Sequence, residues 1–69
     1  MNWDIDILKR EAEILKKIHA FYLYKEKGID FININFPKLK SFILENENKT
    51  PNQIEMEQMS ILEELYSNA

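Results

Sequence analysis

The chain of 69 residues contains no cysteine, one glycine, two prolines and one histidine. Without cysteine it has neither a disulfide nor a thiolate ligand, and a single histidine cannot assemble a zinc site. With Gly28 as the sole glycine there is no glycine-rich loop of the kind that binds nucleotide phosphates. We therefore expect no cofactor and no metal ion.

Long apolar runs are missing as well, since no stretch approaches the roughly 18 apolar residues of a membrane span. A secretory signal begins with positively charged residues that are followed by an apolar segment, whereas this chain has Asp4 and Asp6 in that region. The sequence therefore does not indicate secretion. Together with the lack of cysteine, these features lead us to expect a cytoplasmic protein that does not use a membrane.

The net charge of -3 is unevenly distributed along the chain. Residues 1–28 carry six Lys or Arg against five Asp or Glu, whereas residues 29–69 carry three against seven. A basic patch that would neutralise nucleic-acid phosphates is therefore not evident, and we expect an acidic protein for which nucleic acid is an improbable partner.

Helical periodicity dominates the rest of the sequence. Residues 4–27 predict one long helix whose apolar side chains cover roughly 200° of its circumference at about 100° per residue. Gly28 ends it, because glycine readily adopts the positive φ required after a last turn. Residues 37–47 predict a second helix that begins at a proline.

The clearest helix start in the sequence is at residue 51. Thr50, Pro51 and Gln53 fit the N-cap, N1 and N3 positions of a capping box, so we expect a third helix over residues 51–66. The whole chain, residues 1–69, is thus predicted to be one all-α domain. It would be a small three-helix bundle, with the third helix packed back along the long N-terminal one and the second closing one end.

Residues 29–36 are ambiguous. Ile32, Ile34 and Phe36 alternate with asparagines, as in a half-buried strand, but no second strand is predicted to pair with them. We expect an extended connector whose apolar side chains cover the end of the bundle. The alternative is a strand that pairs with the same stretch of a second subunit.

The apolar arc of the first helix is wider than the stripe of a little over 100° that a surface helix usually shows. A chain this short is also near the lower limit for burying a sufficient core of its own. We therefore expect a second protein chain, as a homo-oligomer or a different partner, to cover part of this helix. The candidate interface residues are Trp3, Ile7, Glu11, Ile14, Phe21 and Tyr24.

Glu11 is the unusual member of this set, because its carboxylate falls inside the apolar arc. A charge in that position must reach water or pair with a cation. Two kinds of partner fit: Lys38 or Lys40 of the same chain, or a basic residue of a second chain.

No catalytic constellation emerges from the sequence. His19 lies at the edge of the apolar arc, where a lone histidine is usually a boundary residue, and the serines stand in no recognisable motif. We therefore predict a protein without enzymatic activity. The favoured function is a small interaction or regulatory protein that binds a protein partner, as an inhibitor, an antitoxin-like protein or an accessory subunit.

Three alternatives stay open. A small DNA-binding transcriptional regulator would use the second and third helices, although the third carries four glutamates. A membrane-surface helix is suggested by lysines beside Trp3 and Phe21, but Asp6 and Glu13 dilute that face. Mimicry of phosphates by the acidic C-terminal half is the third, with six glutamates after residue 44.

Overall fold

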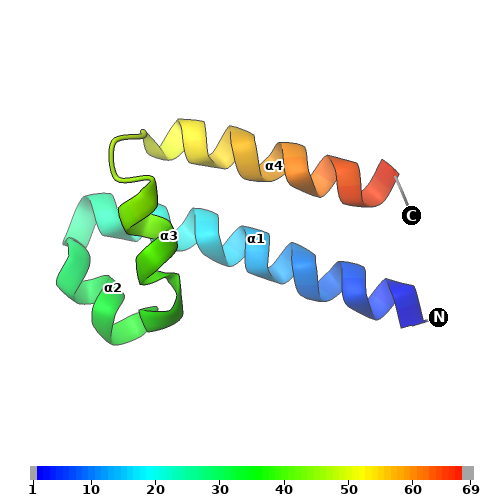
Figure 1. The fold of residues 1–69 in the computed structure, drawn as a ribbon, viewed down its shortest axis with the longest axis horizontal. Coiled ribbons are helices and arrows are strands. Elements are labelled where there is room, and N and C mark those ends of the chain that lie inside the picture. The colour runs from blue at the N-terminus through cyan, green and yellow to red at the C-terminus, as the bar shows by residue number, and fades with distance from the viewer. Residues whose placement is uncertain (1, 68–69) are drawn as a thin grey trace.

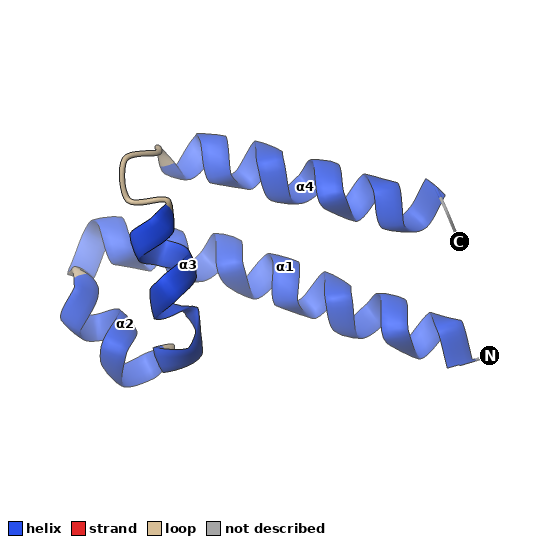
Figure 2. Ribbon diagram, in the orientation of Figure 1, coloured by secondary structure: helices blue, strands red, loops and turns tan. Residues whose placement is uncertain are grey.

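The computed structural model describes the backbone of residues 2–67 and the side chains of residues 5–67. The elements are α1 (Asn2–Lys27), α2 (Ile29–Asn35), the 3-10 helix η1 (Pro37–Leu39), α3 (Lys40–Glu45) and α4 (Pro51–Ser67). Helices and short connections account for this whole range, which contains no strand (Figure 2). The predicted all-helical class is confirmed.

The two long helices, α1 and α4, lie side by side and run in opposite directions (Figure 1). The shorter elements α2, η1 and α3 gather around the C-terminal end of α1. The N-terminal half of α1 therefore has α4 as its neighbour and extends away from the short helices. The molecule measures 39 × 22 × 16 Å as a result.

The prediction for residues 29–36 is wrong, both as an extended connector and as an intersubunit strand, because Ile29–Asn35 form the helix α2. Ile29, Ile32 and Phe36 also stand at helical spacing, and Ile32 is fully buried. Ile34, which the alternating pattern would have buried, is 77% exposed. A helix satisfies its backbone groups within the segment, so no second strand is needed.

Helix boundaries shift in three other places, the smallest shift being at the end of α4, which lies at Ser67 and not at residue 66. The first helix begins at Asn2 rather than at residue 4. The predicted helix 37–47 begins at Pro37 as expected, but its first turn is the 3-10 helix η1 and its α-helical part ends at Glu45. The domain thus has four α-helices in its described part instead of three.

The start of α4 at Pro51 is confirmed, and so is its capping box. The backbone N–H of Thr50 donates to Oε1 of Gln53 at 2.9 Å, and the backbone N–H of Gln53 donates to Oγ1 of Thr50 at 3.2 Å. Each side chain thus satisfies a backbone donor that the first turn of a helix leaves free.

Gly28 separates α1 from α2. Its φ of 91° lies in the region that L-residues with a side chain rarely adopt. Its backbone N–H donates to the carbonyl oxygen of Tyr24 at 2.8 Å, which closes the last turn of α1. The glycine therefore lets the chain leave one helix and enter the next without an intervening loop.

The core forms where the four helices meet. Its members are fully buried and come from every α-helix: Ala20 and Phe21 from α1, Ile32 from α2, Ile43 from α3 and Ile54 from α4. Ile14 and Leu62 extend the buried contact along the seam between α1 and α4. The apolar centre of the molecule thus lies near the end of α1 that carries the short helices.

One polar side chain interrupts the apolar seam. Gln58 of α4 is only 6% exposed, and its Oε1 has no hydrogen-bond partner among the described residues. A buried acceptor without a partner costs about 1 to 3 kcal/mol. We expect Gln58→Leu to raise the free energy of unfolding by about 1 to 2 kcal/mol in urea titrations. Unchanged or lower stability would contradict this, and Ser60→Leu, at an exposed position of α4, controls for added hydrophobicity.

Candidate interaction surface

One side of α1 carries a row of exposed apolar side chains. Ile5 and Leu8 are 55% and 59% exposed, and Leu15 and Tyr22 further along the helix are exposed as well. They lie on the side of α1 next to the one that packs on α4. We name the exposed side the α1 face, defined by Ile5, Leu8, Ala12, Leu15, His19 and Tyr22.

Two hydrogen bonds from tyrosines tie α1 to α4 beside this face. The hydroxyl of Tyr22 donates to Oε1 of Glu55 at 2.7 Å, and the hydroxyl of Tyr66 donates to Oε1 of Glu11 at 2.8 Å. Each helix therefore supplies one donor and one acceptor, at separate points along the antiparallel pair. Sliding one helix along the other would break both bonds, so they help to set the register.

The structure distributes the predicted interface residues differently from the α1 face. Ile14 and Phe21 are buried by the chain itself, and Ile7 is half-buried. Tyr24 is half-buried against the core, with its ring 5.9 Å from that of Phe21 in an edge-to-face arrangement. The side chain of Trp3 lies outside the described residues.

Glu11 has a partner that the sequence did not indicate. The half-buried carboxylate accepts the Tyr66 hydroxyl, 55 residues away along the chain, instead of pairing with Lys38 or Lys40. The face itself uses Ile5, Leu8 and Leu15, which were not among the predicted interface residues. Spacing alone does not separate them from the covered residues, because Ile7, Ile14 and Phe21 repeat with the same seven-residue period.

Because of these tyrosine hydrogen bonds, we expect the free energy of unfolding to decrease at alkaline pH. The pKa values of Tyr22 and Tyr66 are raised above 10.0, chiefly because each hydroxyl donates to a glutamate, and also through desolvation and the charge of that glutamate. Because the folded pKa exceeds the unfolded one, this stabilisation is complete below pH 10.0 and is lost as the pH rises through the raised values.

We therefore expect the melting temperature to fall above pH 10.0 more steeply in the wild-type chain than in the double variant Tyr22→Phe, Tyr66→Phe. Lysines titrate in the same range, near about 10.4. The double variant separates the two effects because it keeps every lysine. Identical slopes for the two chains would show that the tyrosine bonds do not contribute.

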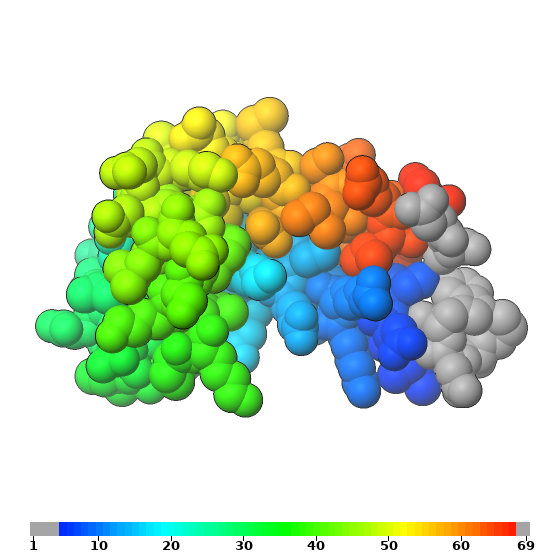
Figure 3. Space-filling model, viewed as in Figure 1, coloured from blue at the N-terminus to red at the C-terminus, as the bar shows by residue number. Residues whose placement is uncertain are grey.

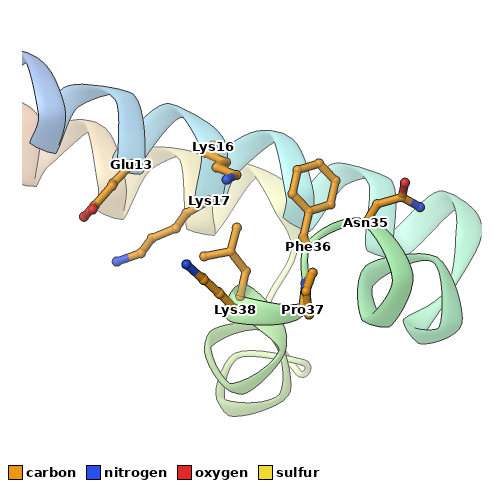
Figure 4. A pocket seen from close by; sticks show the side chains of 8 residues that line it. Glu13, Lys16, Lys17, Asn35, Phe36, Pro37 and Lys38 are labelled. Atoms are coloured by element: carbon orange, nitrogen blue, oxygen red, sulfur yellow. The ribbon is translucent and has the colours of Figure 1, made fainter.

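A second feature is a depression of about 450 Å³ between α1 and η1. In Figure 3 it is a notch between the lobe formed by η1 and α3 and the N-terminal half of α1. Phe36, Pro37 and Leu39 supply its apolar part, and Lys16, Lys17 and Lys38 supply cations (Figure 4). The lining contains no histidine, serine or cysteine, and its one carboxylate is that of Glu13, so it offers mainly positive charge and an apolar wall, without a nucleophile beside a base.

His19 lies beside this depression, with its ring 6.3 Å from that of Phe36 in an edge-to-face arrangement. In the described residues, no three His, Asp or Glu side chains cluster as they would to hold a metal ion. None of the described helices combines the length and the apolar character needed to cross a membrane.

Comparison with protein-family models, with curated proteins and with solved structures finds no match to this chain. The surfaces described above are therefore the basis for assigning a function.

Proposed function

We propose that this chain is a small non-catalytic protein that acts by binding another polypeptide through the α1 face. The observation that carries the proposal is the row of exposed Ile5, Leu8 and Leu15 on a helix whose adjacent side is already packed on α4. Contiguous apolar surface of this kind is typical of protein interfaces and is seldom left in contact with water.

The surroundings of the face support a protein partner. The exposed Tyr22 belongs to the face, and the exposed Tyr66 of α4 lies beside it. Tyrosine is enriched at interfaces because it joins apolar area to a hydrogen-bonding group. On α4, Glu57, Glu63 and Glu64 are exposed. These acids would repel the phosphates of a nucleic acid, which favours a protein partner over DNA.

Leu15→Glu tests the proposal. Because Leu15 is exposed, the variant should retain its circular dichroism spectrum, while a charge in the centre of the face removes binding. The matched control is Met56→Glu, since Met56 is 66% exposed on α4 away from the helices' contact.

The measurement is affinity capture from the native cell with tagged chains, together with an untagged copy of the chain itself, read by mass spectrometry. We expect one polypeptide to be retained by the wild-type chain and by Met56→Glu and to be lost with Leu15→Glu. If all three chains retain the same polypeptides, or none does, the α1 face is not a binding surface.

A further inference from the structure

The residues of the α1 face follow a seven-residue repeat. Intervals of three and four residues alternate along the face from Ile5 to Tyr22, and every position is exposed. This is the spacing of the a and d positions of a coiled coil, in which each apolar side chain inserts between residues of a facing helix. The a positions are Ile5, Ala12 and His19, and the d positions are Leu8, Leu15 and Tyr22.

We propose that the partner of the α1 face is a second copy of this chain, bound with the two α1 helices parallel and in register. The inference rests on the proposed function and specifies its partner. Isoleucine at a with leucine at d favours parallel two-stranded pairing, and the first heptad of the face has this combination in Ile5 and Leu8. The stripe from Ile5 to Tyr22 is about 26 Å long at 1.5 Å per residue.

The charges beside the stripe select the parallel orientation. Lys9 and Lys16 occupy e positions, and Glu11 occupies a g position. In a parallel pair the g position of one helix meets the e position five residues further along the other. Glu11 then lies opposite Lys16 of the second copy, and symmetry forms this ion pair twice.

The antiparallel arrangement is disfavoured by the same charges. When the same stripe is overlapped in the opposite direction, e positions face e positions, so Lys9 meets Lys16 of the second copy twice. Like charges in such positions are destabilising. Orientation is therefore decided by charge rather than by the apolar side chains, which could pair either way.

Both members of the proposed ion pair are free to form it. Within residues 5–67 the ion pair observed joins Lys49 to Glu57. Nζ of Lys16 lies 6.0 Å from the centroid of the Phe36 ring. Glu11 uses Oε1 for Tyr66, and a carboxylate has further lone pairs for a lysine. The N-terminal half of α1 also extends away from α2, η1 and α3 (Figure 1), and Ile5, Leu8 and Leu15 are exposed.

The lack of native cysteine allows orientation to be tested by single-cysteine variants. In the parallel dimer the d residues of the two copies face each other, so Leu8→Cys should form a disulfide between identical positions under mild oxidation and run as a dimer without reductant. In the antiparallel dimer residue 8 faces residue 19, and only a mixture of Leu8→Cys with His19→Cys would cross-link. Met56→Cys, on exposed α4, should remain monomeric in the gel.

Sedimentation equilibrium supplies the second measurement. We expect a concentration-dependent dimer for the wild-type chain. Lys16→Glu should raise the dimer dissociation constant about tenfold, because two attractive pairs become repulsive. Mixing Lys16→Glu with Glu11→Lys should restore the dimer, since each helix then carries one sign of charge at both positions.

Four outcomes distinguish the hypotheses. A disulfide between two copies of the Leu8→Cys variant, with weakening of the dimer by Lys16→Glu, supports the parallel arrangement. A dimer that cross-links only between residues 8 and 19 overturns it. A chain that is monomeric at every concentration also overturns the parallel dimer. If that chain still captures a different polypeptide in a manner that depends on Leu15, the proposed function is supported without the dimer. A monomer with no Leu15-dependent partner ends both proposals.

Discussion

Phe21→Ala is expected to lower the urea midpoint of unfolding sharply or to leave the chain unfolded without urea. Phe21 is fully buried at the point where all four α-helices meet. Replacing a buried phenylalanine by alanine usually costs about 3 to 5 kcal/mol, through lost burial and the cavity that remains. A domain of this length has a total stability of roughly 3 to 10 kcal/mol, so the substitution removes much or all of it.

The measurement is the helical circular dichroism signal and its urea midpoint at fixed protein concentration, because self-association would itself add stability. Ile34→Ala is the control, since Ile34 is an exposed apolar residue whose truncation should change stability by less than about 0.5 kcal/mol. A Phe21→Ala chain that unfolds at the wild-type midpoint would mean that this side chain is not central to the core.

Gly28→Ala should destabilise the fold by about 1 to 3 kcal/mol, because the residue combines φ 91° with ψ 176°. A Cβ at this glycine would meet no atom within 4 Å, so the cost comes from the backbone conformation and not from a collision. The expected result is a lower urea midpoint with an unchanged slope.

Chemical synthesis offers a direct control for this effect, since the chain is short. D-alanine at position 28 favours positive φ and restricts the unfolded chain, so that variant should be at least as stable as the wild type. If the D-alanine chain were destabilised as much as the L-alanine chain, the backbone explanation would be wrong.

Local signals predicted the parts of this fold that depend on local chemistry. Gly28 marked the end of α1, and Thr50 with Gln53 marked the start of α4, because a positive φ and a capping box depend on residues close in sequence. The segment that became α2 was mispredicted because the spacing of Ile29, Ile32 and Phe36 fits a helix while Ile32, Ile34 and Phe36 fit a strand. Which of these sets is buried depends on where α1 and α3 lie.

The candidate surface shows the same division. A very wide apolar arc on α1 was visible in the sequence, but its division into a covered side and an exposed side depends on the direction from which α4 approaches. Phe21 and Leu15 are equally plausible interface residues until that direction is known. The bond from Tyr66 to Glu11 likewise joins residues from opposite ends of the chain, and no spacing rule links them.

The position of the core at one end of the α1 and α4 pair also implies that the molecule opens unevenly. Amide hydrogens near Ile5 and Leu8 should exchange with solvent through local fraying, whereas those near Ala20 and Ile43 should exchange only when the whole chain unfolds. A polypeptide bound along α1 would slow exchange first in the fraying half. Hydrogen exchange along this single helix would therefore locate the bound chain without any substitution.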